Sequence, residues 1–446
     1  MRKLIIDGRC GVLLASLVFF GLLYPLTKPF PYTDDWAFLP YLLDARHPDM
    51  WWLFALHNDH RIPLQKILYL VLMTISGGDF RVMIGANVCV IAATALLWVQ
   101  MARQLTSSSS WSEWLVPGVL LGLGFNTVAW GFSFQFLSGL FFLAAANVLW
   151  LRSLRADPRY LGGAAFLALT LCAWCGGNGL ITATVVGAGF LCGVAYRGAW
   201  RLLSIGAMVA VALWVATVAT IWLRWQGSAA TAASGHDLGI YVRFAYEMSK
   251  SWFGVYAAQH PAISGAGGAL VMLVGLLGSL FWLVKHRPQG GDNLAFLRML
   301  PVFLAALQTA VMVALISVSR AAAQPWFPGL ELHYGYLVTA LPLCAWLVIL
   351  MIPGAALRHT LLAALIVLVG MAYSGNVLWR LDAAKTEYHD SSAVVADLVS
   401  PMPAEDVAHR HIRAFYWVDG KDAEAAVTAG IQRLRELPFW APAPQK

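Results

Sequence analysis

Eleven stretches of the chain, each 16 to 22 residues long, contain no Asp, Glu, Lys or Arg. An α-helix of about 20 apolar residues crosses the ~30 Å hydrocarbon core of a bilayer. Apolar residues make up 59% of the 446 and charged residues only 12%, against about 25% charged in soluble domains. So few charges cannot cover a water-soluble particle of this size. The sequence therefore predicts an all-α polytopic membrane protein, and it excludes a disordered chain and a soluble enzyme.

Basic residues in the loops between these stretches indicate an orientation. We expect spans at 11–27, 82–101, 114–130, 132–151, 160–175, 179–196, 202–223, 263–284, 299–319, 334–353 and 359–379. Cytoplasmic loops carry an excess of Lys and Arg. With the N-terminus inside, the cytoplasmic segments hold thirteen Lys and Arg residues, and the opposite short turns at 124–131 and 176–178 hold none. We therefore expect an extracytoplasmic C-terminus, and we assign the net charge of +7 to topology, not to nucleic-acid binding.

The polar segments divide the chain into two expected parts. Residues 1–379 form a transmembrane module with two long extracytoplasmic loops, 28–81 and 224–262. Residues 380–446 form a small extracytoplasmic cap, because Ala, Val and Leu alternate there with charges as they do in short amphipathic helices. The chemistry-bearing residues gather in the first of the two loops.

An acidic pair, Asp34 and Asp35, follows the first span within a few residues. At the membrane–water boundary, partial desolvation and mutual repulsion raise the pKa of at least one such carboxyl, which suits a general base. A structural interpretation has equal weight: Thr33 would cap a helix whose first turn contains both carboxylates. The dipeptide alone does not separate these two hypotheses.

A second cluster packs His57, Asn58, Asp59, His60 and Arg61 into five residues, directly after an aromatic run typical of a helix that lies in the interface plane. Arg61 and His60 suit a phosphate, because a guanidinium binds two phosphate oxygens and an imidazole is a switchable donor. A metal site built from the histidines and Asp59 is a weaker hypothesis, and a solvated turn is the plain alternative. No cofactor is required by the sequence, although Asp34 and Asp35 could supply oxygens to Mg²⁺ or Mn²⁺.

These features together resemble a known group of proteins. The acidic pair, the long first loop with an interfacial helix, about eleven spans and a terminal polar cap resemble the GT-C class of integral-membrane glycosyltransferases. His57–Pro63 resembles the Asn-Glu-His-Arg-Ile type motif of a bacterial branch, with Asp59 in place of Glu. Trp130–Phe136 resembles the Trp-Gly-Phe-Gln segment of that branch, interrupted by a Ser. Where the branch tends to have Ser-Arg-Tyr, this chain has Leu332-His333-Tyr334.

The resemblance implies a glycosyltransferase in the bacterial inner membrane. Its donor would be a polyprenyl-phosphate-linked sugar, its acceptor a glycan, lipid or protein of the envelope, and membrane lipids would surround it. Asp34 or Asp35 would be the catalytic base. The residues expected to bind the lipid phosphate or the sugar are His57, Asp59, His60, Arg61, Gln135, Arg320, His333 and Tyr334.

Two other classes of function stay open at this point. A lipid-linked-sugar transporter or flippase would carry ionisable residues near mid-depth of the bilayer. Here the polar residues gather at one face, which favours chemistry at the interface. A non-catalytic scaffold of an envelope complex would have no common site around the segment 57–61.

Overall fold

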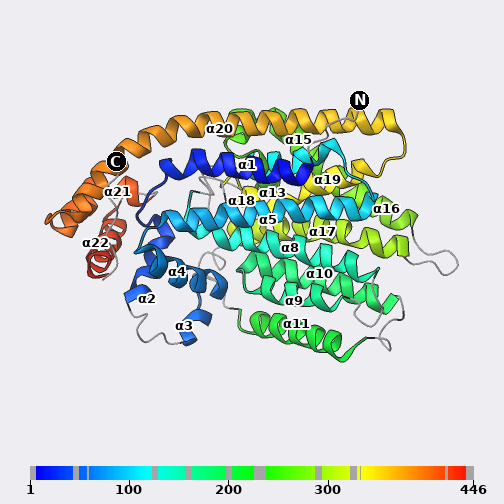
Figure 1. Ribbon diagram of the computed structural model, residues 1–446, viewed down its shortest axis with the longest axis horizontal. Helices are drawn as coiled ribbons and strands as arrows, with labels where there is room; N and C mark the ends of the chain where they lie inside the picture. Colours follow the sequence, from blue (N-terminus) through cyan, green and yellow to red (C-terminus); the bar gives the residue numbers. More distant parts are fainter. Residues whose placement is uncertain are drawn as a thin grey trace.

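The structure is a computed structural model in which every regular element is a helix within the described residues, beside one isolated bridge between His57 and His60 (Figure 1). The described residues are 7–43, 50–57, 60–122, 129–155, 162–196, 198, 203–225, 238–286, 294–321, 329–331, 333–416 and 420–437. Asp59 and Leu332 lie outside them. The prediction of an all-α chain is confirmed for this part.

Eight of the helical segments in the described part are long and apolar enough to cross a membrane. They contain α1 (Gly8–Leu23), α5 (Arg81–Thr106), α8 (Phe134–Ser153), α10 (Gly177–Tyr196), α11 (Ile205–Leu223), α15 to α16 (Pro261–Leu273 and Ser279–Lys285, joined by the π-helical turn η9, Val274–Gly278), α17 (Leu294–Arg320) and α20 (Ala355–Val399). Each corresponds to one of the predicted spans. The chain is therefore a multi-pass membrane protein by helix length and composition.

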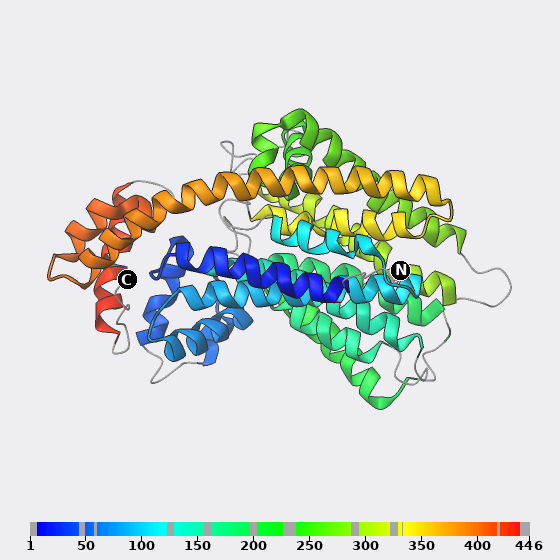
Figure 2. The same cartoon turned by 45° about the horizontal axis from the view of Figure 1, so that its top comes forward.

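The described residues of the other three predicted spans form shorter helices: α6 (Leu115–Gly122), α9 (Gly163–Ala173) and the pair α18 (Tyr334–Val338) and α19 (Ala340–Leu350). Residues 123–128 of the predicted span 114–130 lie outside the described residues. Helix α9 packs against α8, α10 and α11, and α19 packs against α17 and α20. Every residue of α19 from its first to Ile349 is buried. These helices run beside the long ones (Figures 1 and 2), although their length alone does not qualify them as spans.

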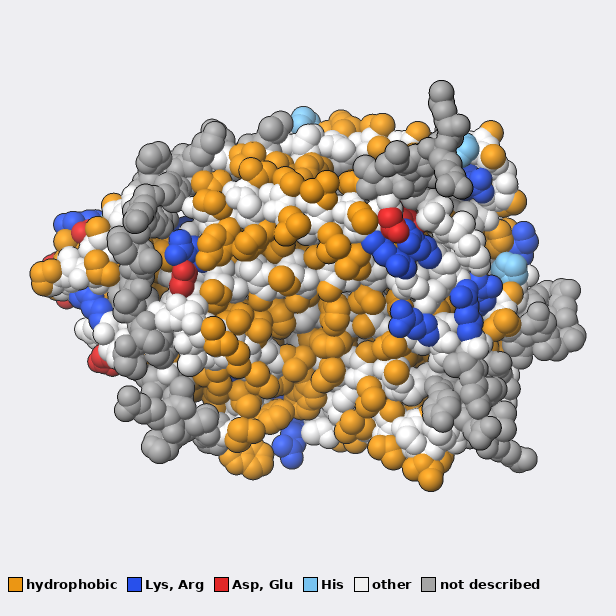
Figure 3. Space-filling view, viewed as in Figure 1, with side chains coloured by type: hydrophobic (Ala, Val, Ile, Leu, Met, Phe, Trp, Pro, Cys, Tyr) orange, Lys and Arg blue, Asp and Glu red, His pale blue; other side chains and the backbone are white. Residues whose placement is uncertain are grey.

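The surface of the bundle is apolar over a broad band. Leu13, Leu14, Leu17 and Val18 of α1 are each about half-exposed or more. Figure 3 shows apolar side chains across the middle of this face, while Lys and Arg gather toward the end of the molecule where α5 ends. A contiguous apolar surface of this extent is rare on soluble monomers. It agrees with helices that face lipid.

The first long loop folds into short helices at one end of the bundle: η2 (Thr33–Phe38), α2 (Leu39–Leu43), α3 (Met50–Phe54) and α4 (Pro63–Ser76). Trp51 on α3 is 80% exposed, as expected for a helix that lies at the membrane surface. The second long loop contains α13 (Leu238–Lys250), the 3-10 turn η8 (Ser251–Phe253) and α14 (Val255–Gln259).

Helix α20 has 45 residues and is therefore about 67 Å long, more than twice the thickness of the hydrocarbon core. Figures 1 and 2 show it running along the bundle and continuing past it to the helices α21 (Ala404–Phe415) and α22 (Lys421–Glu436). The expected boundary at residue 380 lies inside this continuous helix. The cap consists of the end of α20 together with α21 and α22.

The cap is docked on the first loop by its own apolar cluster. The Trp36 indole N–H donates to the carbonyl of Phe415 at 3.4 Å, and the two rings meet edge to face at 5.4 Å. Lys28 Nζ donates to the carbonyl of Ala414 at 3.2 Å. Ile431 and Leu434 of α22 belong to the same cluster as Trp36, separate from the main core of the bundle. The first loop and the C-terminal cap therefore meet at one end of the bundle.

Replacing Gly430 tests this docking. A Cβ at Gly430 would lie 2.4 Å from the Trp36 ring, so Gly430→Ala should lower the free energy of unfolding of the cap by about 1–3 kcal/mol. Gly370→Ala on α20 is the matched control, because a Cβ there meets nothing within 4 Å. We expect faster tryptic cleavage of the cap in detergent for Gly430→Ala only. Equal cleavage of the two variants would contradict the packing described.

Candidate functional site

The predicted site residues of the first loop meet residues of η5 (Gly131–Ser133) and the start of α8. These residues lie at the end of the bundle that the cap covers. Three chain segments that are far apart in sequence therefore supply the site: the first loop, the 130–136 segment and the cap.

Asp35 is the buried member of the acidic pair, with 3% of its surface exposed. Its carboxylate accepts hydrogen bonds from the Tyr69 hydroxyl, from the backbone N–H of Tyr32 at 3.2 Å and from the backbone N–H of Phe132. Burial raises the pKa of the Asp35 carboxyl to about 7, while these three donors act in the opposite direction. One carboxylate thus joins η2, α4 and η5.

A stack of rings backs this carboxylate. The Tyr69 ring stacks on Phe38 with centroids 4.2 Å apart, and Phe38 stacks on His57 at 5.7 Å. A Cβ at Gly131 would lie 2.7 Å from the Tyr69 hydroxyl. The close approach of η5 to Tyr69 therefore requires glycine at this position.

Asp34 differs from Asp35 in its exposure and in its hydrogen-bond partners. It is half-buried, and within the described residues no hydrogen bond or ion pair holds its carboxylate. Burial raises the pKa of Asp34, and the nearby His60 acts against this. Burial, and then the charge of Asp34, raise the pKa of Tyr416. Asp34 on the first loop therefore lies near the cap.

Thr33, just before the pair, has a left-handed backbone with a φ of 48°. This conformation is unfavourable for a β-branched residue by about 1–2 kcal/mol. It is also where η2 begins, so the strain sits at the turn that sends Asp34 and Asp35 to different surroundings.

His60 is held by α8 and by the turn before α10. Its Nε2 lies 3.1 Å from the Gln135 Oε1, and the Asn178 side chain donates to the Gln135 carbonyl at 3.4 Å. A Cβ at Gly176 would lie 3.3 Å from the His60 ring, and Gly176 has a φ of 92°. Gln135 is therefore a positioning residue for the imidazole.

Arg61 is a half-buried cation that makes no hydrogen bond or ion pair in the described part of the chain. The neighbouring Lys66 is engaged, because its Nζ donates to the carbonyls of Trp52 and Ala55 at 2.8 Å each. Burial, with a smaller effect from Arg61, lowers the pKa of Lys66 to about 8. Lys66 thus joins α3 to α4, whereas Arg61 has no such partner among the described residues.

A second group of predicted residues contacts the other side of the 130–136 segment. The His333 ring stacks on Phe136 at 5.0 Å, and its Nδ1 lies 3.4 Å from Glu331 Oε2. Burial, and then the charge of Arg320, lower the pKa of His333 to about 3, so its imidazole is neutral at pH 7. Burial raises the pKa of Glu331, and Arg320 opposes this. The Tyr334 ring contacts His333 at 4.4 Å and is buried.

The structure therefore brings the predicted residues together as two groups that share one segment. Asp34, Asp35, His57, His60 and Gln135 form the first group, with Arg61 next to His60 in the chain, and Arg320, His333 and Tyr334 form the second. Among the described residues no set of three His, Cys, Asp or Glu side chains is arranged to hold a metal ion. Asp59, which belonged to the metal hypothesis, lies outside them.

Sequence reasoning missed three residues of this region: Tyr69, Glu331 and Tyr416. Tyr69 follows Gln65 by four residues on α4, and that spacing put both polar groups on one helix face. Glu331 closes the loop before His333. No sequence pattern connects Tyr416 with Asp34, because only the docking of the cap brings them near one another.

The helical bundle with its polar groups at one end defines a polytopic membrane protein with a candidate interfacial site. No family model matches the chain, and neither a curated protein nor a solved structure matches it. The assignment of function therefore depends on the site itself.

The raised pKa of Asp35 predicts a pH-dependent stability. Between about pH 4 and 7 the native state keeps a proton that the unfolded state, with a pKa of 3.8, has released. The stability that Asp35 contributes is therefore greatest below pH 4 and is lost as the pH rises to about 7. We expect the melting temperature of the wild type to fall relative to that of Asp35→Asn over this interval. Asp79→Asn, which removes the part-buried partner of Arg81, serves as the control, and parallel profiles for wild type and Asp35→Asn would contradict the assignment.

Proposed function

We propose that this protein is a glycosyltransferase that moves a sugar from a polyprenyl-phosphate donor to an envelope glycan, lipid or protein at the extracytoplasmic membrane face. One observation carries the proposal: the two adjacent carboxylates have different roles. Asp35 has three hydrogen-bond donors, whereas Asp34 has none among the described residues and lies near His60, the neighbour in sequence of the cation Arg61. These surroundings support Asp34 as the base and Arg61 as the anion-binding group of the proposal.

The proposed topology has eleven spans, with α6, α9 and α18–α19 as the three short ones, in a GT-C-like arrangement. The N-terminus would be cytoplasmic and the C-terminal cap periplasmic, in a bacterial inner membrane. The gathering of Lys and Arg at the end opposite the candidate site supports this orientation. The candidate site then faces the periplasm.

In the proposed reaction Asp34 accepts the proton of an acceptor hydroxyl. The acceptor oxygen forms a bond to the sugar C1, and the bond between C1 and the phosphate oxygen breaks, so the electron pair leaves with the polyprenyl phosphate. A carboxylate whose pKa is raised toward the ambient pH is a better general base than a fully solvated one. Asp35, whose oxygens are occupied, would hold η2 in place.

Arg61 and His60 would neutralise the phosphate as it leaves. Two hydrogen bonds from a guanidinium to phosphate oxygens stabilise the charge that develops there. Arg320, on the other side of the 130–136 segment, is a second cation for the donor or the acceptor. If Mg²⁺ or Mn²⁺ takes part, Asp34 is the carboxylate of the pair with oxygens available to it.

The carboxylate assignment is tested by Asp34→Asn. We expect about a 10²–10⁴-fold loss of transfer with unchanged thermal unfolding, measured with a labelled polyprenyl-phosphate sugar in proteoliposomes. Asp79→Asn, an acidic residue of the same loop that pairs with Arg81, should retain activity. Near-full activity of Asp34→Asn would remove the general base from the proposal.

The phosphate assignment is tested by two substitutions of Arg61. Arg61→Ala should weaken donor binding at least tenfold and acceptor binding much less, because a charged hydrogen bond to the donor phosphate is lost. Arg61→Lys should restore donor binding only in part, since an ammonium makes no bidentate contact. Arg243→Ala, an exposed arginine on α13, is the control for general charge effects. Unchanged donor KM in Arg61→Ala would show that the phosphate binds elsewhere.

A further inference from the structure

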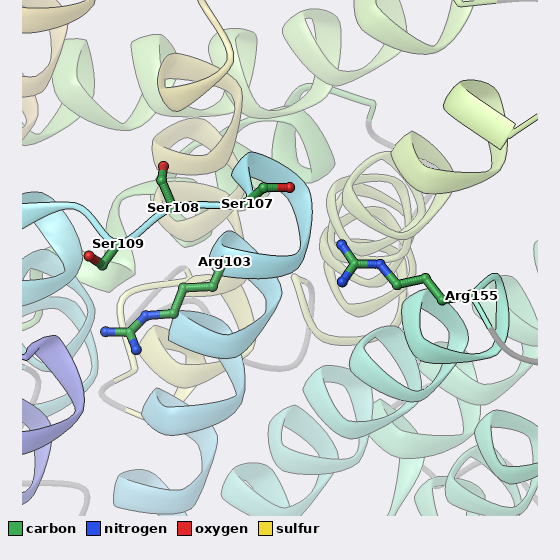
Figure 4. A pocket seen from close by; sticks show the side chains of 5 residues that line it. All are labelled: Arg103, Ser107, Ser108, Ser109 and Arg155. Atoms are coloured by element: carbon green, nitrogen blue, oxygen red, sulfur yellow. The ribbon is translucent and has the colours of Figure 1, made fainter.

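A cavity of about 340 Å³ lies at the opposite end of the bundle from the aspartate pair, where α5 ends. Arg103, Ser107, Ser108, Ser109 and Arg155 line it (Figure 4). Helix α5 has 26 residues, so its two ends are about 39 Å apart. This cavity is therefore separate from the candidate glycosyl-transfer site.

Arg103 forms a wall of the cavity and is already neutralised. Its Nε and one Nη donate to the Glu113 carboxylate at 2.9 and 2.7 Å, and the guanidinium also pairs with Asp7. This guanidinium holds the start of α1 against the segment that follows α5. It is not the cation that would hold a further anion.

Arg155 is the cation with donors to spare. One of its N–H groups donates to the Gln104 carbonyl at 3.0 Å, near the C-terminal end of α5. It forms no ion pair with any carboxylate in the described part of the chain. Arg155 is exposed, and among the described residues this bond to Gln104 occupies only one of the five N–H groups of its guanidinium.

Three exposed serines line the same space. Ser107 ends α5 with a φ of 58°, and Ser108 and Ser109 follow it. In Figure 4 the Ser107 hydroxyl points toward the side where Arg155 lies, while the Ser108 and Ser109 hydroxyls point in other directions. The Arg155 guanidinium and the Ser107 hydroxyl can together donate to an anion with three or more acceptor oxygens, which a phosphate has and a carboxylate lacks.

We propose that this cavity binds a phosphate group. At the end of a lipid-facing bundle the abundant source of phosphate is an anionic phospholipid headgroup, and a soluble phosphate compound has the same chemistry. The proposal does not depend on glycosyl transfer, and its test does not measure it.

A role for Arg155 as a plain helix cap is separated from phosphate binding by a matched residue. Arg298 on α17 donates to the same Gln104 carbonyl at 2.7 Å and to that of Leu105 at 3.2 Å, but it does not line the cavity. Arg155→Ala and Arg298→Ala both remove one cap from α5. Only the first removes the cation of the proposed site.

The experiment measures binding of phosphatidylglycerol to the full-length protein in detergent by native mass spectrometry, with phosphatidylcholine as the zwitterionic reference. Phosphatidylglycerol should bind Arg155→Ala about tenfold more weakly than wild type, and Arg298→Ala within about twofold of wild type. Arg155→Lys, which keeps the charge, should bind phosphatidylglycerol more weakly than wild type. It replaces Arg155→Ala as the test variant if Arg155→Ala does not fold. Equal phosphatidylglycerol binding by Arg155→Ala and Arg298→Ala, or by Arg155→Lys and wild type, would overturn the proposal.

Inorganic phosphate distinguishes the two sources. A thermal shift by millimolar phosphate that Arg155→Ala abolishes would identify a site for soluble phosphates. Arg155-dependent binding of phosphatidylglycerol without such a shift would identify a lipid headgroup site. Either result supports phosphate binding, and a phosphate effect of equal size in Arg155→Ala and wild type, without Arg155-dependent lipid binding, refutes it.

Discussion

The buried carboxylate of Asp35 is the interaction on which the candidate site depends. Donors from three separate segments meet on it: the Tyr69 hydroxyl of α4 and the backbone N–H groups of Tyr32 and Phe132. A buried charge without such partners would be strongly destabilising. Because these three donors must converge, η2, α4 and η5 have fixed positions relative to one another.

The apolar composition explains why so many polar groups gather at the two ends of the bundle. Helices that face lipid hold few ionisable groups, since each is costly in hydrocarbon. The polar residues of the first loop, the 130–136 segment and the end of α17 therefore meet at one end. Arg103, Arg155 and Arg298 meet at the other, around the C-terminal end of α5. The long α20 runs along the bundle from the end with the arginines to the end with the candidate site, where the cap lies.

Much of the fold follows from the sequence, because charge-free stretches of about 20 residues have few alternatives to crossing a membrane. The features of the fold that the sequence does not predict have physical causes. Short helices such as α9 satisfy their backbone internally and pack against several neighbours, so length alone does not show whether they span. The sequence is compatible with a continuous α20, since no Gly or Pro occurs between Gly375 and Pro401. The change from apolar to charged residues nevertheless predicted a domain boundary inside this helix.

The sequence predicts which residue types gather at the site, but it does not predict which of the two aspartates is buried and hydrogen-bonded. Asp34 and Asp35 are chemically identical, and only tertiary contacts with Tyr69 and Phe132 distinguish them. The structural hypothesis holds for Asp35, which accepts from the backbone N–H of Tyr32 at the start of η2, but the N-cap of this helix is Tyr32 and not Thr33. The general-base hypothesis for Asp34 stays a prediction. Interactions with the cap, such as the effect of the Asp34 charge on the pKa of Tyr416, depend on residues far away in the sequence.

The central claim is that a donor phosphate binds beside Asp34. A cryo-EM map of the protein in nanodiscs with a non-transferable polyprenyl-phosphate sugar analogue tests this directly. We predict phosphate density in contact with Arg61 or His60 and the sugar C1 within reach of Asp34. Density for the phosphate at a different face of the bundle, with Asp34 facing bulk water or lipid, would contradict the account.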